Sequence, residues 1–328
     1  MEIQCPLCEG GDVSDFLAAP DRFHLRTRSY KLVRCARCAC VWLRDPPAPE
    51  ELSLSYSEDY HKAIVNAGEI SATERWKDQR KLISKYKNGG DILDVGCSSG
   101  AFLSTLPLSK WKLYGIEIAP ETAEKARVTT GAQVFTGDVM QASFLPDSFD
   151  VITCFDVLEH VYNPRQFLNR VQEWLKPDGI FYVILPNIDA WESRIFGSFW
   201  FGLELPRHLF HFSPKSLRYI MHSLGFREVS IATPSTSYIE RSANYVSSGI
   251  VSKLGFHPSP QSAAKENTIA WRAIRKALRL SIVRPFGQVA SRAGAGASLQ
   301  AVLAKNAKTQ QEAHAGNSSD SSGISRRG

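Results

Sequence analysis

The chain lacks several features that would quickly assign a sequence to a class. It contains no run of about 20 uncharged apolar residues, so no segment is expected to span a membrane. No secretory segment precedes Cys5, and the seven cysteines leave one without a partner. A disulfide-stapled secreted protein is therefore disfavoured, and we expect a cytoplasmic protein with reduced thiols.

Length and composition favour one catalytic unit with appendages. The 328 residues exceed a single typical domain, and an apolar share of 43% is enough for a sizeable core. The predicted parts are a metal-binding module at 1–43, a linker with a covering helix at 44–88, a catalytic domain at 89–237, a helical insertion at 238–291, a closing strand at 292–305 and a disordered tail at 306–328.

The most informative segment, 91–100 (DILDVGCSSG), runs a short apolar strand into an acidic turn. Gly96 and Gly100 can take backbone conformations closed to other residues and leave room beside a ligand. Asp94 places a carboxylate at the carboxyl end of the strand, where open α/β sheets bind ligands, and it suits a cationic amino group. Position 98 is serine and no third glycine follows, so a pyrophosphate ligand is disfavoured.

The sequence then alternates predicted strands with predicted helices, which is the pattern of a parallel sheet. A first crossover helix is expected to begin near Ala101. Glu117 ends the second strand, about twenty residues beyond the turn, where a carboxylate can accept both hydrogen bonds of a ribose diol. This second strand covers 112–116, and the later predicted strands cover 133–136, 149–155, 180–185 and 226–231.

In this order, the segments DVGCSSG, GIEIAPE, GDV, FDVITCFDVLEHV and LKPDGIFYVILPN resemble the class I S-adenosylmethionine-dependent methyltransferases, over roughly 56–226. The resemblance implies a doubly wound, Rossmann-like α/β sheet of seven strands, closed by a strand at 298–303. The positions that it assigns to the cofactor are Asp94, Gly96 and Gly100 for the methionine half, Glu117 for the ribose, Asp138 and Val139 for the adenine, and the backbone around Phe155 for the amino group. Ser98 stands where the family more often has glycine.

Two C-x-x-C hooks near the amino terminus indicate a metal site. They are Cys5 with Cys8 and Cys35 with Cys38, and their convergence would give the four thiolates of a tetrahedral zinc site. The loop between the hooks is longer than the commonest ribbon spacing. Four thiolates leave no open coordination position, so we expect a structural zinc ion. Cys40 is interpreted as a bystander.

The segment 190–212, rich in aromatic residues, begins at the carboxyl end of the fifth strand. It has two interpretations of equal weight: a lid or platform against a sugar ring, or the core of a helical cover. The segment 207–214 resembles a part of zinc-hooked methyltransferases that modify sugars, in which a histidine at the position of His208 removes the proton from the accepting group. Those carbon methyltransferases have Glu-His, whereas this chain has Arg207 before His208. Both O- and C-methylation stay open, but the change favours a hydroxyl acceptor or a differently charged sugar.

A hydroxyl is a poor nucleophile until its proton is removed, so a histidine base is expected. His208 is the first candidate and His160, just past the fourth strand, is the second. The alternative for each is a structural hydrogen bond, which is the commoner role of a lone histidine.

The insertion contains an amphipathic basic helix at 266–284, with apolar residues near one face and arginines around the rest. It could lie peripherally on an anionic membrane, at the inner face. Packing on the domain with a solvated face is the favoured interpretation, because globular surface helices have the same pattern.

We therefore predict methyl transfer to a small molecule, a nucleotide-linked or lipid-linked sugar in glycan synthesis. A nucleic-acid methyltransferase is the alternative, suggested by the cysteine module and the net charge of +6. It is disfavoured because Asp156-Val-Leu-Glu159 replaces the Asn/Asp-Pro-Pro-aromatic motif of base-amine methyltransferases. A cofactor-binding protein without activity is a third and weaker alternative.

Overall fold

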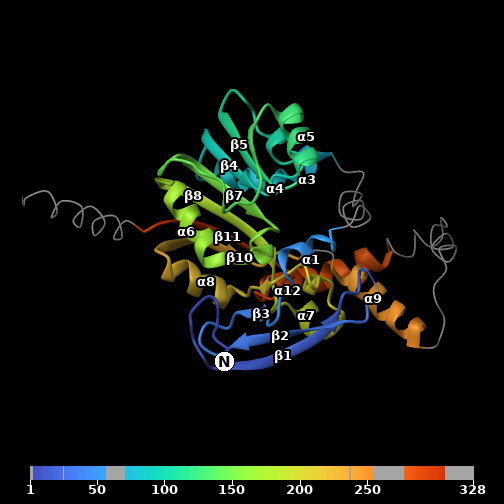
Figure 1. Ribbon diagram of the computed structural model, residues 1–328. Helices are drawn as coiled ribbons and strands as arrows, with labels where there is room; N and C mark the ends of the chain where they lie inside the picture. Colours follow the sequence, from blue (N-terminus) through green and yellow to red (C-terminus); the bar gives the residue numbers. More distant parts are fainter. Residues whose placement is uncertain (1–2, 25, 57–70, 236–237, 254–276, 307–328) are drawn as a thin grey trace, which may run out of the picture.

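A computed structural model describes residues 3–24, 26–56, 71–235, 238–253 and 277–306. The chain forms two sheets, a seven-stranded one and a four-stranded one below it in the view of Figure 1. None of the helices within the described ranges is long and apolar enough to cross a membrane. Most of the predicted tail and residues 254–276 of the predicted insertion lie outside the described residues.

The large sheet has the strand order β10-β11-β8-β7-β4-β5-β6. Its strands are β4 (Gly90–Val95), β5 (Trp111–Glu117), β6 (Gln133–Thr136), β7 (Phe149–Phe155), β8 (Leu175–Pro186), β10 (Phe226–Ala232) and β11 (Ser298–Lys305). The pairs among β4 to β8 are parallel, while β11 runs antiparallel between β8 and β10. This confirms the predicted doubly wound sheet of seven strands. From β4 the chain winds outward through β5 and β6 and then returns to β7, so the switch point lies at the carboxyl ends of β4 and β7.

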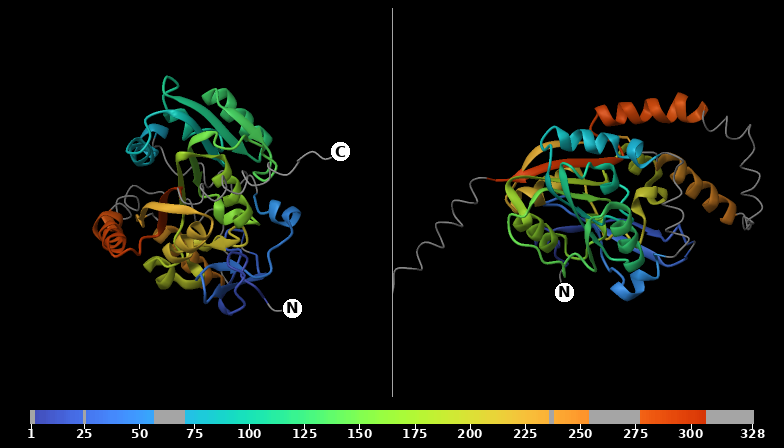
Figure 2. Two further views of the ribbon diagram at one scale, coloured as in Figure 1. Left: turned by 90° about the vertical axis from the view of Figure 1, so that its left-hand side faces the viewer. Right: turned by 90° about the horizontal axis from the view of Figure 1, so that it is seen from above.

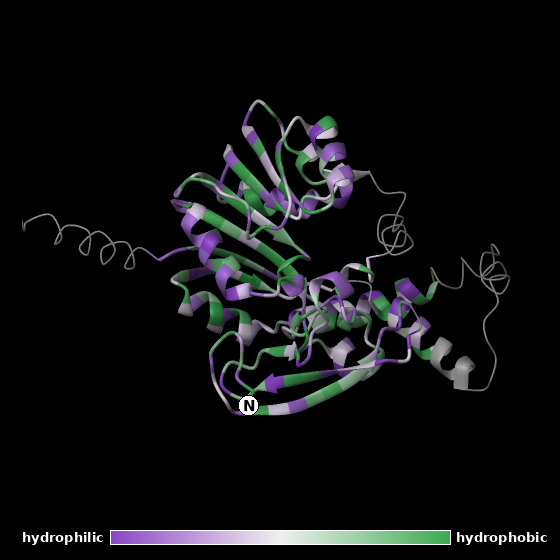
Figure 3. Ribbon diagram, viewed as in Figure 1, coloured by the Kyte–Doolittle hydropathy of each residue, from purple (hydrophilic) through white to green (hydrophobic). Residues whose placement is uncertain are grey.

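Helices cover both faces of this sheet. They are α3 (Ala72–Arg75), α4 (Lys77–Ser84) and α5 (Pro120–Thr130) on one side, and α6 (Pro164–Trp174) and α8 (Pro214–Ser223) on the other. Successive strand residues alternate between the two cores: Leu93 and Ile152 pack toward α6 and α8, whereas Ile92 and Val151 pack toward α4 and α5. Hydropathy follows this arrangement, with apolar residues concentrated along the inner strands (Figure 3).

Two predicted local structures differ from those observed. After the turn, the chain forms only a 3-10 turn, η1 (Leu103–Thr105), where a helix from Ala101 was expected. Pro107 follows at once, and the hydroxyls of Ser104 and Thr105 donate to the carbonyls of Ala101 and Phe102. The fifth predicted strand also begins earlier, since Leu175 already pairs with Phe149 directly after α6.

The small sheet is antiparallel, with the order β1-β2-β3-β9. It consists of β1 (Val13–Pro20), β2 (Ser29–Cys35), β3 (Val41–Leu43) and β9 (Phe210–His211). The last strand comes from far along the chain: Trp42 pairs with Phe210 and Val41 with His211. The amino-terminal module therefore shares its sheet with the segment that contains His208.

The remaining elements form a cover on the carboxyl side of the large sheet. They are α1 (Pro49–Ser53), η2 (Leu158–His160), α7 (Trp191–Phe196), η3 (Gly197–Phe199), η4 (Phe201–Leu203), α9 (Tyr238–Lys253), the π-helical η5 (Arg279–Val283) and α12 (Arg284–Arg292). Helix α9 packs against α7, η3 and η4. The right-hand view in Figure 2 shows α9 and α12 at the outside of the molecule.

Candidate active site

The turn after β4 takes its shape from residues with positive φ. Gly96 and Gly100 have φ values of +74° and +81°, and Ser98 has +49°. A Cβ atom on Gly96 would lie 2.4 Å from Val157 Cγ2, and one on Gly100 would lie 2.6 Å from Thr130 Cγ2. Both glycines are thus required by backbone conformation and by space, whereas serine is accommodated at position 98.

Glu117 ties this turn to the end of β5. Its Oε2 accepts a hydrogen bond from the Ser98 amide at 3.0 Å, and its Oε1 accepts one from the Ala119 amide at 2.9 Å. The carboxylate is therefore held in place by backbone donors. Each oxygen keeps a further lone pair that can accept a ligand hydroxyl.

Asp94 is almost completely buried at the end of β4, with 4% of its surface exposed. Burial raises the pKa of this carboxyl to about 7, and the nearby Glu117 charge acts in the same direction. The Thr153 hydroxyl donates to Asp94 Oδ1 at 2.7 Å and partly offsets the shift. A cationic group bound at this position would favour the ionised carboxylate.

The other predicted cofactor residues lie at the same edge of the sheet. Asp138 follows β6, is exposed, and its Oδ1 accepts the Met140 amide at 2.7 Å. Val139 beside it is half-buried. Phe155 ends β7, and its ring stacks on Trp76 with 5.5 Å between centroids. The structure thus brings the predicted cofactor residues from β4, β5, β6 and β7 to one edge.

A group of acidic and histidine residues lies after β7. Asp156 is exposed with φ +54°, while Glu159 is only 1% exposed. Burial raises the pKa of Glu159 to about 8, and neither of its carboxylate oxygens has a hydrogen-bond partner among the described residues. Sequence reasoning did not single out Glu159 as a functional residue.

His208 is buried and held at both ring nitrogens. Its Nδ1 lies 2.9 Å from the Gly202 carbonyl oxygen, and its Nε2 lies 3.0 Å from Glu204 Oε2. Both partners are acceptors, so both nitrogens carry protons. Burial alone would lower the pKa of His208, but the hydrogen bond and charge of Glu204 raise it above its ordinary value. The His208 charge in turn outweighs the effect of burial on Glu204, whose pKa falls to about 2.

This ion pair corrects one inference from the sequence. Arg207 replaces the acid that precedes the histidine in sugar carbon methyltransferases, but His208 is not without a carboxylate. Glu204 supplies one from four residues earlier. The i, i+4 spacing was visible in the sequence, although the segment around Glu204 gives no helical signal that would have drawn attention to it.

His160 differs from His208 in its protonation. Its Nδ1 lies 2.9 Å from the Arg207 carbonyl oxygen and 3.0 Å from Tyr56 Oη. Burial and the positive charge of His208 lower the pKa of His160 to about 3, so the ring is neutral. With the Nδ1 proton donated to the carbonyl, Nε2 retains the lone pair, and no hydrogen bond from the described residues reaches it.

The two histidine rings are neighbours, with 4.7 Å between their centroids. Glu159, His160 and His208 each offer one potential metal-ligating atom, and these atoms lie within 4.8 Å of one another. To bind a metal ion, His208 would have to lose the Nε2 proton that it donates to Glu204. In the observed arrangement, His160 Nε2 is the histidine nitrogen of this group that is left with a lone pair to accept a proton.

Arg207 connects this group to the amino-terminal module. Its side chain is 1% exposed, and Nη1 lies 3.6 Å from Asp21 Oδ2 while Nε lies 3.8 Å from Glu204 Oε1. Its guanidinium also lies 5.4 Å from the ring centroid of Phe23. Because the Arg207 carbonyl also bonds His160, one residue links both histidines to the small sheet.

The aromatic residues of 190–212 belong mostly to the cover. Trp200 and Phe201 are 1% and 9% exposed. Both pack on Tyr238 of α9, with centroids 6.0 and 5.5 Å apart. For these two residues the structure favours the core interpretation over a platform for a sugar ring.

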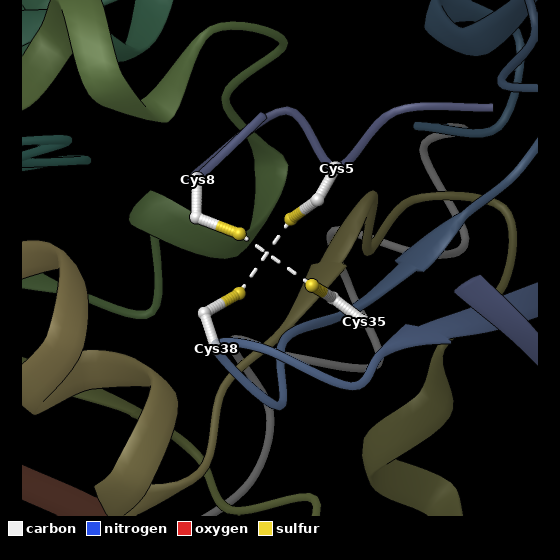
Figure 4. A group of neighbouring side chains, drawn as sticks. All are labelled: Cys5, Cys8, Cys35 and Cys38. Atoms are coloured by element: carbon white, nitrogen blue, oxygen red, sulfur yellow. Dashed lines mark hydrogen bonds between the residues drawn. The ribbon is translucent and has the colours of Figure 1, made fainter. Parts of the chain in front are cut away.

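The four cysteines of the two hooks point toward one centre (Figure 4). The Sγ atoms of Cys5 and Cys38 are 3.5 Å apart, as are those of Cys8 and Cys35. A tetrahedron with Zn–S bonds of about 2.3 Å has S–S edges of about 3.8 Å, so the sulfur positions fit this ion. Cys40 is buried but lies outside the group.

Comparisons with known proteins agree with this geometry. A methyltransferase-domain family matches residues 69–231. The mitochondrial ubiquinone biosynthesis O-methyltransferase of Schizosaccharomyces pombe is 33% identical over 99 residues, which cover 28% of this chain and 36% of that protein. The Pseudomonas putida GB-1 ubiquinone biosynthesis O-methyltransferase is 31% identical over 141 residues, which cover 40% and 59%. The chain thus matches about a third to three-fifths of the length of these relatives.

The fold is also similar to that of a chain in the complex of the Haloferax volcanii Trm112 methyltransferase activator with a methyltransferase. The TM-score is 0.50 at 16% identity, and the alignment covers 79% of this chain and all of the other. The strand order is that of the class I methyltransferase fold, and residues 69–231 match a methyltransferase-domain family.

We expect Gly96→Ala to weaken cofactor binding and Gly131→Ala to leave it unchanged. Both glycines have positive φ, +74° and +69°, so each alanine should cost about 1 to 2 kcal/mol of unfolding free energy. Only at Gly96 does the added methyl group also meet a neighbour, whereas nothing lies within 4 Å at Gly131. Calorimetry should show binding weakened about tenfold or more for Gly96→Ala alone. Equal affinities would contradict a role of this turn in holding the cofactor.

Glu117→Ala should weaken cofactor binding by about 2 to 3 kcal/mol, as expected for hydrogen bonds to a charged group. Glu121→Ala is the control, because it removes an equal charge from an exposed position on α5. Calorimetric titration of both variants measures the difference. Unchanged affinity in a folded Glu117→Ala protein would refute its assignment to the ribose.

Proposed function

We propose that the whole protein transfers a methyl group from S-adenosylmethionine to a hydroxyl group of a small molecule. The observation that supports this most directly is His160, a neutral histidine with an available Nε2 in η2, which follows Val157, a neighbour of Gly96 in the cofactor turn. The names of the relatives, which are O-methyltransferases, favour the same chemistry.

The cofactor, when bound, supplies an electrophilic methyl group on a sulfonium. Asp94, the Gly96 turn and Glu117 would hold and orient it. His160 Nε2 would take the proton of the acceptor hydroxyl as the oxygen attacks the methyl carbon. Burial raises the pKa of the neighbouring Glu159 to about 8, so this carboxyl group is mostly uncharged near neutral pH and has no charge-stabilising role.

His208 was the first candidate base in the sequence, and its role in this proposal is different. Its two protons are engaged by Gly202 and Glu204, so it has no lone pair to offer. We assign it to positioning: its charge keeps the adjacent His160 neutral, and its ion pair fixes the wall of the site.

The proposed acceptor is a nucleotide-linked or lipid-linked sugar, on the basis of the cysteine module and of the segment 207–214. A second candidate is an acceptor of ubiquinone biosynthesis, favoured by the 33% identity to the Schizosaccharomyces pombe protein. Turnover of methyl-labelled cofactor against nucleotide sugars, lipid-linked sugars, hydroxylated quinone precursors and RNA separates these classes. Methylation of RNA alone would overturn the proposal of a small-molecule acceptor.

We further propose that Cys5, Cys8, Cys35 and Cys38 hold one structural zinc ion. Their four sulfurs lie within 4.8 Å of one another, and a cation would relieve the repulsion between their thiolates. The ion would stabilise the sheet in which β9 is the last strand.

His160→Ala should lower turnover by about a hundredfold or more with little change in cofactor affinity. Because the pKa of His160 is about 3, the wild-type rate should not rise between pH 6 and 7 through its ionisation. His208→Gln is the comparison: it should reduce both thermal stability and turnover. Near-normal turnover in folded His160→Ala, or a steep rise of the wild-type rate above pH 6.5, would return the role of base to His208, whose pKa lies above its ordinary value.

Cys35→Ser should abolish zinc binding and lower the melting temperature, because a structural zinc contributes folding energy directly. Cys40→Ala is the matched control, since its sulfur is equally buried but lies outside the cluster. Metal analysis of reduced protein should give one zinc per chain for the wild type and the control. Absence of zinc from freshly prepared wild type would end this proposal.

A further inference from the structure

The helix that runs through η5 and α12 presents apolar side chains to solvent. Leu278, Ile282 and Val289 are 49%, 60% and 54% exposed. Their spacing of four and then seven residues places them along one side of the helix. The adjoining side contacts the protein, where Phe286 packs on Trp191 with ring centroids 6.0 Å apart and Ala290 is buried. The helix is thus anchored beside an apolar stripe that stays exposed.

Basic residues accompany this stripe along the helix. Arg279, Arg284 and Arg292 are exposed. The sequence from 267 to 292 contains six basic residues and no aspartate or glutamate. Among the described residues, Glu240 of α9 faces this helix, and its Oε1 lies 3.8 Å from Arg279 Nε. The net charge along the stripe is therefore strongly positive.

We propose that the stripe Leu278, Ile282 and Val289, with its flanking arginines, is a docking surface for an anionic lipid bilayer. Apolar side chains on one face of a helix and arginines beside them are what interfacial binding requires. A second copy of the chain is a poorer occupant, because pairing two such helices would bring their arginines together without acidic partners. This inference extends the amphipathic pattern at 266–284 toward the carboxyl terminus, to Val289.

The position of the helix determines which part of the protein would face the bilayer. Helix α9 packs against η3 and η4, the cover beside His208, and its Glu240 pairs with Arg279. Docking through the stripe would place this cover near the bilayer. The docking itself does not depend on the proposed methyl transfer and is measurable without cofactor or acceptor.

The test is sedimentation of the full-length protein with vesicles. Binding should be clear with phosphatidylcholine vesicles that contain about 30% phosphatidylglycerol and weak with phosphatidylcholine alone. It should fall at about 0.5 M salt, where charges are screened. The double variant Leu278→Glu/Ile282→Glu should bind the anionic vesicles about tenfold less well, and Arg284→Gln/Arg292→Gln several-fold less well.

Val128→Glu is the matched control, because it replaces an apolar residue of α5 that is 79% exposed elsewhere on the molecule. It should bind vesicles like the wild type. If the double variant melts at a lower temperature, Val289→Glu serves in its place. Equal binding by the stripe variants and wild type, or no binding of wild type at low salt, would overturn the proposal. A dimer that Ile282→Glu dissociates, with no vesicle binding, would assign the stripe to self-association.

Discussion

The active-site wall depends on the attachment of β9 to the amino-terminal sheet. Only two residue pairs form this ladder, Trp42 with Phe210 and Val41 with His211, and the Leu43 amide adds a hydrogen bond to the Leu209 carbonyl. The buried Arg207 reinforces the connection by lying between Asp21 of the module and Glu204 of the site. Such a buried cation is tolerated only with its carboxylate partners in place, so loss of either acid would disturb both regions at once.

This arrangement also explains why two adjacent histidines differ in charge. Glu204 is close enough to keep His208 protonated, and the resulting positive charge adds to burial in keeping His160 neutral. Glu204 therefore keeps His208 charged, whereas burial is the main reason that His160 is neutral. The ion pair of His208 with Glu204 offsets the desolvation of both charges, and the carbonyls of Gly202 and Arg207 accept hydrogen bonds from His208 and His160.

Much of the large sheet could be predicted from the sequence, because its strands are short apolar runs separated by regular helices. The position of Glu117 followed from its distance to the glycine turn. The small sheet was less accessible, since β9 has two residues and its pairing with β3 is a tertiary contact without a local signal. The positions of Glu159 and Glu204 were missed for a related reason. The burial of Glu159 and the orientation of the His208 ring toward Glu204 are tertiary features that the local sequence does not reveal. The helix expected at Ala101 failed because Pro107 follows too closely.

The order of strands in space has a consequence for biosynthesis. The sheet of the first module is completed by residues 210–211, and the large sheet receives β11 between β8 and β10 only when residues 298–305 are available. During synthesis from the amino terminus, β3 and β8 therefore each retain an open edge until these late segments emerge. Neither sheet can close as an early, self-contained unit on the ribosome. The edge of β8 must be protected from pairing with other strands until residues 298–305 have been synthesised.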